Sequence, residues 1–205
     1  MLRIEERVND IYKTYINVVS PYILEYELLG NTFPIEILNE VRAVFTHLSK
    51  YYLSDDNSIK EKNISKAEGH IKRSILDCYK YICMAYEDKY TEFKKDYSRV
   101  DLSFVDNGDF LPKLLEARKN AINLMKEARK TDLLITSDDE AGSDEAYIKY
   151  EKAFVAYSLV YELIDNSYKK MENLKKKAVF KDIISVSGWI IGIIGIILTI
   201  ISIIL

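Results

Sequence analysis

Apolar residues recur at alternating spacings of three and four along most of the first 168 residues, and no alternation of period two persists. This spacing places side chains on one face of an α-helix, so the pattern predicts an all-α fold. Glycine and proline fall almost only between the helical stretches, which divides them into separate elements. Five helices are predicted, over about residues 2–30, 34–53, 58–100, 112–134 and from 144 onward.

The same spacing predicts which residues form the core. In the first helix they are Ile4, Val8, Ile11, Tyr15 and Val19, with a kink expected at Pro21. In the second helix they are Leu38, Val41, Phe45, Leu48 and Tyr52. In the third helix they are Ile64, Ala67, Ile71, Ile75, Cys78, Ile82 and Ala85. A capping box of Ser58 with Glu61, or of Ser65 with Glu68, is expected to begin the third helix.

An aromatic stripe runs along the fifth predicted helix. Its members are Tyr147, Tyr150, Phe154, Tyr157, Tyr161, Ile164, Tyr168 and Met171. A stripe of this spacing is typical of packing in a core or between subunits, and a stacking platform for bases is the alternative. We expect an N-cap at Ser137 or Ser143, and a long stalk helix that continues to Leu205 with a possible hinge at 185–188.

The last 23 residues, from Ile183 to Leu205, carry no charge, and twelve of them are isoleucine. At about 1.5 Å per residue such a helix spans the hydrocarbon core of about 30 Å. The N-terminus is charged from its third residue and has no apolar region of a signal peptide. The pattern therefore predicts one C-terminal transmembrane helix, and a single-pass, tail-anchored protein.

A basic neck precedes this segment. Residues 169–182 carry six lysines, and the net charge of −3 therefore conceals a mildly acidic body. The positive-inside tendency places the bulk of the chain, residues 1–168, in the cytoplasm at the cell inner membrane. Lys175, Lys176, Lys177 and Lys181 are the lysines expected to contact anionic lipid.

Small and weakly polar residues form one stripe along the predicted membrane helix. They are Ser185, Gly188, Gly192, Gly195, Thr199 and Ser202, at spacings of 3, 4, 3, 4 and 3. Small residues let helix backbones approach closely in lipid, so the stripe predicts a homo-oligomer. The same stripe could line a pore in a closed assembly, and the sequence does not choose between an interface and a pore lining.

Several kinds of chemistry have no support in the sequence. Two cysteines, Cys78 and Cys83, offer neither a disulfide framework nor a CxxC metal site. The chain has no GxSxG, Walker, GxGxxG or HExxH motif. The acidic stretch 136–145 fails as a calcium loop because its twelfth position from Asp138 is Lys149. No metal or cofactor is expected.

The two histidines are His47 and His70, and His47 follows Arg42 in the sequence Arg-Ala-Val-Phe-Thr-His. An arginine and a histidine at this spacing, in a bundle of about five helices, resemble the HEPN superfamily of prokaryotic defence proteins. That resemblance implies metal-independent RNA cleavage, in which the histidine and arginine of two protomers converge across a dimer. Five helical residues turn through about 500°, so Arg42 and His47 of one chain point roughly 140° apart.

Two further residues belong to the same candidate site. Glu40 lies seven residues from His47 and shares its face. His70 shares a polar face with Arg73, Ser74 and Asp77, which is either part of the same cleft or a network between helices. Ala43 stands where many active members have a polar residue, so an inactive HEPN-like scaffold is the alternative to a catalytic site.

A HEPN-like body joined to a membrane helix is similar to the membrane-associated HEPN-like accessory proteins of Cas13b-type CRISPR systems. This resemblance implies an oligomeric effector of antiviral defence that acts by pore formation or depolarisation of the inner membrane. A membrane-tethered endoribonuclease is the alternative, and a scaffold that holds a partner at the membrane is a third. The expected partners are further copies of the chain, inner membrane lipid and a Cas effector or RNA.

Overall fold

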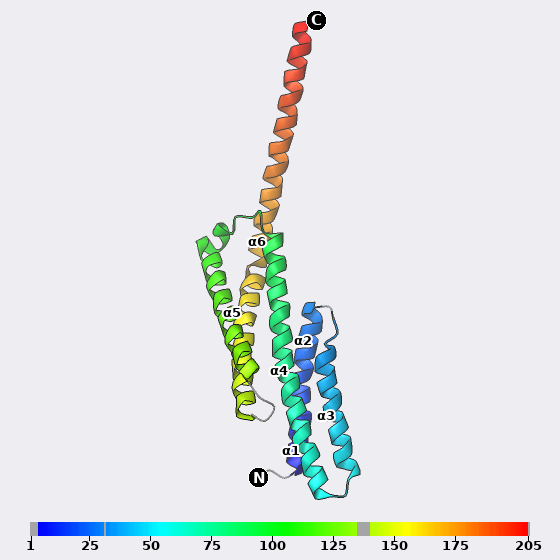
Figure 1. The fold of residues 1–205 in the computed structure, drawn as a ribbon. Coiled ribbons are helices and arrows are strands. Elements are labelled where there is room, and N and C mark those ends of the chain that lie inside the picture. Colours follow the sequence, from blue (N-terminus) through cyan, green and yellow to red (C-terminus); the bar gives the residue numbers. More distant parts are fainter. Residues whose placement is uncertain (1–3, 31, 135–139, 205) are drawn as a thin grey trace. The chain divides into compact units, whose positions relative to one another are not determined.

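The computed structural model describes residues 4–30, 32–134 and 140–204, and leaves out the side chains of 140–143, 182, 183, 185, 186 and 198–204. All regular elements in these ranges are helical, which confirms the all-α prediction (Figure 1). They are α1 (Ile4–Thr14), the π-helix η1 (Tyr15–Val19), α2 (Ser20–Gly30), α3 (Ile35–Leu53), α4 (Asn57–Asp96), the 3-10 helix η2 (Leu102–Gly108), α5 (Phe110–Leu134) and α6 (Glu140–Ile204).

The chain divides into two compact units. The first comprises Met1–Thr91 and Glu116–Tyr161, and the second comprises Glu92–Leu115 and Glu162–Leu205. In the first unit, α4 contacts α1, α2 and α3 as well as α5 and the start of α6. This helix is therefore the central element of the unit that holds the candidate site.

The predicted core of α4 is confirmed at every position. All seven residues, from Ile64 to Ala85, are buried. The predicted capping boxes are wrong, because Asp56 caps the helix by accepting hydrogen bonds from the amides of Ser58 and Ile59. Glu61 and Glu68 instead bind Arg7 of α1. The helix ends at Asp96, four residues before the predicted end.

The described part of the N-terminal stretch, from Ile4 to Gly30, is helical as predicted, but its irregularity precedes Pro21. The five residues Tyr15–Val19 are π-helical, and the amide of Ser20 donates to the carbonyl of Tyr15. Pro21 has no amide hydrogen for the regular bond to the preceding turn, and its ring crowds that turn. Widening the turn before the proline accommodates this defect.

The predicted core face of α3 is wrong in its rotation. Phe45 is 72% exposed and Tyr52 is 63% exposed, whereas Ile37, Val44 and Leu48 are buried. The sequence of α3 has apolar residues on two adjoining faces, and both share Leu48. The face with the smaller branched residues packs into the unit, and the face with Phe45 stays open.

The predicted loop 101–110 contains η2. Asp101 accepts a hydrogen bond from the amide of Ser103, and the backbone then enters the left-handed region at Asp106, Asn107 and Gly108. Glycine and asparagine tolerate this conformation best, which explains why the Asn-Gly pair marks the turn. Helix α5 follows from Phe110, two residues before the predicted start.

Helix α6 begins at Glu140, four residues before the predicted start, and continues to Ile204 as one helix. The N-cap predicted at Ser137 lies outside the described residues, and Ser143 lies within the helix rather than at its cap. Most of the aromatic stripe packs in the core, since Tyr150 and Tyr157 are buried and Tyr147 and Phe154 contact Tyr79. Tyr168 is exposed.

Among the described residues, no helix combines the length and the apolar character needed to cross a membrane. In the predicted membrane segment, the backbone is helical to Ile204, and side chains are described for Ile184 and for residues 187–197. The membrane span itself stays a prediction.

Candidate polar site on α3 and α4

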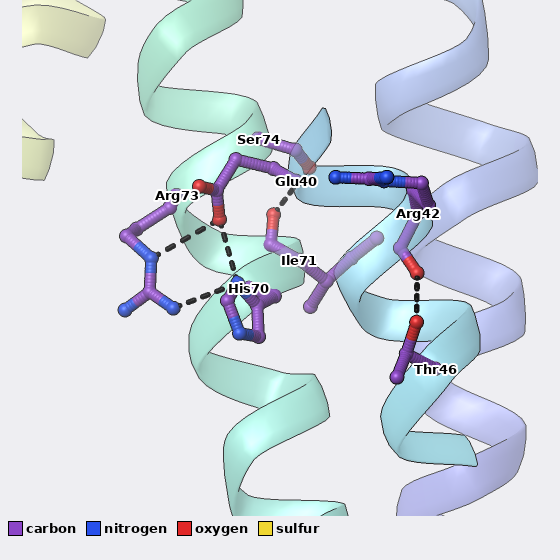
Figure 2. Close-up of polar contacts among 7 residues, drawn as sticks. All are labelled: Glu40, Arg42, Thr46, His70, Ile71, Arg73 and Ser74. Carbon is purple, nitrogen blue, oxygen red and sulfur yellow. Dashed lines mark hydrogen bonds and ion pairs between the residues drawn. The ribbon is translucent and has the colours of Figure 1, made fainter. Parts of the chain in front are cut away.

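Helices α3 and α4 bring Glu40, His47 and His70 together with Arg73 and Asn63. Glu40 and His47 lie seven residues apart on α3, and Asn63 and His70 lie seven apart on α4. A spacing of seven is close to two helical turns, so each pair presents its side chains on one face. The two pairs meet where the helices pack against each other, and Figure 2 shows the contact of Glu40 with His70.

Glu40, His70 and Arg73 share one set of hydrogen bonds. Glu40 Oε2 lies 2.8 Å from His70 Nδ1 and accepts a hydrogen bond of 3.1 Å from Arg73 Nε. Arg73 Nη2 also lies 2.8 Å from His70 Nδ1. A guanidinium only donates, so Nδ1 either accepts from Arg73 or carries a proton and donates to Glu40. The imidazole therefore has two alternative hydrogen-bond partners at a single nitrogen.

The tautomer of His47 follows from its partner. Its Nδ1 lies 2.9 Å from Asn63 Oδ1, and Asn63 Nδ2 donates to the carbonyl of Ile59 at 2.8 Å. Because the amide nitrogen of Asn63 is used in that way, its oxygen faces His47, and Nδ1 of His47 must be the donor. Nε2 of a neutral His47 is then the nitrogen able to accept a proton. Its ring stacks on that of His70, with centroids 5.2 Å apart.

Arg42 does not join this polar site. In Figure 2 the only dashed line that reaches Arg42 ends on its main-chain carbonyl, which accepts a hydrogen bond from Thr46. Its side chain lines an apolar groove between α3 and the α1–η1 segment. Arg42 and His47 of one chain therefore do not converge, as the helical spacing predicts. Arg73 is the arginine that lies beside a histidine.

Solvent reaches the side chains of the site. The side chains of Glu40 and His70 are about a quarter and a fifth exposed, and that of Arg73 is half exposed. A neutral imidazole beside a carboxylate and a guanidinium has the groups needed for acid–base chemistry on an anionic substrate.

Further along α4, burial raises the pKa of Asp77 above its usual value, against the opposing effect of Lys80. Within the described residues, no group of three or more His, Cys, Asp or Glu side chains could hold a metal ion.

The predicted lipid-contacting lysines belong to the second unit. Lys175 lies 3.8 Å from Glu172 and 5.0 Å from the ring centroid of Tyr97, whose hydroxyl donates to Glu172. Lys176, Lys177 and Lys181 are exposed. Lys175 and Lys176 line a shallow groove of about 350 Å³ together with Glu172, Val179 and Phe180. This surface therefore combines positive charge with exposed apolar side chains.

The small-residue stripe is described only in part. Apart from the adjoining residues and the nearby backbone of α6, no described atom lies within 4 Å of the point where a side chain at Gly188 or Gly192 would begin. Gly195 is also in the helix, and the side chains of Ser185, Thr199 and Ser202 lie outside those that the structure describes.

Two polar partnerships could not be named from the helical patterns. Asn63 had a signal, since it lies seven residues before His70, but its partner His47 depends on how α3 and α4 are rotated against each other. The sequence gives no signal for the contacts of Arg7, because arginine and acidic residues on amphipathic helices usually lie on solvated faces.

No protein-family model, curated protein or solved structure matches this chain.

Proposed function

We propose that this chain is a membrane-anchored oligomeric effector with a HEPN-like body, which acts in antiviral defence by permeabilising or depolarising the inner membrane. The observation that carries the proposal is the open glycine face of α6. Gly188 and Gly192 lie one turn apart and meet no other part of the described chain. They lie within 23 uncharged residues.

The surroundings of these glycines support a membrane location. Trp189, Ile190, Ile191, Ile193, Ile194, Ile196 and Ile197 are all exposed. A run of exposed isoleucines is costly in water, whereas in lipid it needs no protein cover. The glycine face then allows close backbone contact between copies, and identical faces around a symmetry axis are satisfied by closure into a ring.

The basic neck supports the orientation. Lys176, Lys177 and Lys181 are exposed just before the uncharged segment, where cytoplasmic lysines are attracted to anionic lipid. The body, residues 1–168, would then lie in the cytoplasm, where a Cas effector or RNA could reach the polar site. The HEPN-like fold, the membrane span and these partners are parts of the same proposal.

The test is the mass of the detergent-solubilised chain by light scattering, with wild type beside Gly192→Leu. The matched control is Ile193→Leu, which changes the neighbouring residue away from the small-residue stripe. We expect a closed oligomer of more than two copies that only Gly192→Leu breaks, and loss of dye release from liposomes in the same variant. A mass that is indifferent to Gly192 would contradict the proposal and reduce the helix to an anchor.

A second candidate function rests on the polar site. The stacked pair of His47 and His70, with Glu40 and Arg73 beside it, favours a metal-independent endoribonuclease. Arg42 would act on substrate held by a second copy, because it does not meet His47 within one chain. RNA cleavage in EDTA that is lost in His47→Ala and kept in Gly192→Leu would support the enzyme. Absence of cleavage by wild type would exclude it.

A further inference from the structure

The apolar groove on α3 is distinct from the polar site, and apart from Arg42 its lining residues have no role in either proposed function. It has a volume of about 440 Å³ and is lined by side chains of α1, η1, α3 and α4. Ile11, Val44, Leu48 and Ile71 are buried in the first unit and form a preformed floor. Tyr12 and Phe45 are exposed at its walls.

Arg42 is the only charged residue among the described residues that line the groove. Its guanidinium makes no ion pair in the described part of the chain, and its side chain is exposed. Glu40, the nearest acid in the sequence, is engaged by His70 and Arg73 instead. The groove thus offers one uncompensated cation at the edge of an apolar surface.

We propose that this groove binds a single-chain amphiphile with a carboxylate head, such as a fatty acid. The carboxylate would pair with the fork of donors on Arg42, which matches a carboxylate geometrically. The alkyl chain would cover the aliphatic and aromatic lining, whose removal from water provides the affinity. The volume lies within the range of small-molecule sites and far below that of a folded partner.

The length of the groove fits this ligand. From Leu38 to Leu48 the helix rises about 15 Å, at about 1.5 Å per residue. An extended chain advances about 1.2 Å per bond, so the groove accommodates about a dozen carbons. Helical side chains lean toward the N-terminus, which directs Arg42 toward the Leu38 end and leaves the rest of the groove for the chain.

A second copy of the protein fits the groove less well. In a twofold contact the same patch faces itself, so the Arg42 side chains of both copies would meet without an acid among the lining residues. Like charges in such a contact are destabilising. A monoanionic ligand neutralises Arg42 instead.

The test uses the full chain in phosphatidylcholine nanodiscs and a twelve-carbon fatty acid that carries a photoreactive diazirine. The corresponding alcohol is the neutral probe, and mass spectrometry locates the labelled peptides. We expect the acid to label peptides that contain Tyr12, Tyr15 and Phe45 at least fivefold more than the alcohol does. Arg42→Leu abolishes that preference, Arg42→Lys retains part of it, and Val41→Trp lowers labelling by both probes at least fivefold by filling the groove.

The matched control is Arg99→Leu, which removes an exposed arginine outside the groove and leaves the preference intact. Circular dichroism confirms that each variant keeps its helix content. Three results would overturn the proposal: equal labelling by acid and alcohol in wild type, labelling confined to residues 183–205, or a Phe45→Asp variant whose mass falls to a smaller oligomer. The last result would assign the groove to a second copy. None of these results depends on the outcome for Gly192→Leu, so this proposal and the proposed membrane function fail separately.

Discussion

The imidazole rings of His47 and His70 lie nearly parallel, with planes 18° apart and centroids 5.2 Å apart. Each ring is held by a different partner, since His47 binds Asn63 and His70 lies against Glu40 and Arg73. The stack therefore joins two hydrogen-bonded networks, each of which contains residues of both α3 and α4. We expect a change in one network to reach the other through the two rings.

The first prediction concerns this coupling. We expect His47→Ala and His70→Ala to destabilise the fold less than additively when combined, because each variant alone already removes the stack. The coupling free energy should be about 0.5 to 1.5 kcal/mol, as for other stacked ring pairs. Thermal unfolding of the solubilised full chain, followed by circular dichroism for both single variants and the double variant, measures it. Strict additivity would show that the two rings stack without interacting.

The sequence predicts this site in part. The spacing of seven places Glu40 and His47 on one face of α3, and the structure brings both to His70. It also predicts that Arg42 points elsewhere. What the spacing does not contain is the rotation of α3 against α4, which decides that Arg73 and Asn63, rather than Arg42, become the neighbours of the histidines. That rotation is set by which apolar face of α3 is buried.

The contrast between α3 and α4 shows why the fold was predictable only in places. Helix α4 has one apolar face bounded by charged residues, so its core from Ile64 to Ala85 follows directly from the spacing. Helix α3 has two adjoining apolar faces, and spacing alone does not rank them. Contacts with the other helices, rather than the spacing within α3, decide that Val44 is buried and Phe45 is exposed. The open face that results is the groove we propose as a ligand site.

The second prediction concerns Arg7, which ties α1 to α4. Its Nε and Nη2 donate to the two carboxylate oxygens of Glu68 at 2.7 and 2.6 Å, and it also binds Glu61 and Ser65. The hydrogen bonds to Glu68 raise the pKa of the guanidinium above its usual value, so Arg7 stays charged. We expect Arg7→Leu to lower the free energy of unfolding by about 1 to 2 kcal/mol, since it leaves two acids without their partner.

Chemical denaturation of the full chain measures this loss. Lys13→Ala is the control, because Lys13 and Asp10 form an exposed pair at 3.9 Å and its removal should cost less than about 0.5 kcal/mol. Arg7→Lys should fall between the two, since a lysine keeps the charge but not the two parallel hydrogen bonds. Equal stability of Arg7→Leu and Lys13→Ala would show that the contacts of Arg7 with Glu61 and Glu68 do not stabilise the fold.

The third prediction concerns alkaline pH. Burial raises the pKa of the Cys78 and Cys83 thiols to about 12, from an ordinary value of 9.0. The folded chain therefore keeps protons that the unfolded chain releases above about pH 9, and stability falls as pH rises from there toward 12. Each thiol contributes a slope of up to about 1.4 kcal/mol per pH unit in that window.

Melting temperatures at pH 8.0 and 10.5 test this expectation, and the difference should shrink in Cys78→Ala. The buried tyrosines Tyr79 and Tyr150, whose pKa values are also raised by burial, should keep part of the effect in that variant. At pH 8.0 both thiols should resist alkylation by iodoacetamide until the chain is unfolded. Rapid alkylation of the native chain would show that the thiols are not protected as described.

The last prediction compares two tyrosines of the same stripe on α6. Tyr150 is 2% exposed, and its hydroxyl lies 3.2 Å from Asp132 of α5, whereas Tyr168 is 56% exposed. The spacing predicts the same packing role for both residues, but of the two only Tyr150 fills space between helices. We expect Tyr150→Ala to cost about 3 to 5 kcal/mol of unfolding free energy, as for large buried aromatic residues, and Tyr168→Ala to stay within about 0.5 kcal/mol. Denaturation of both variants under one condition compares them directly, and a large loss for Tyr168→Ala would mean that its exposed face is covered in the assembled protein.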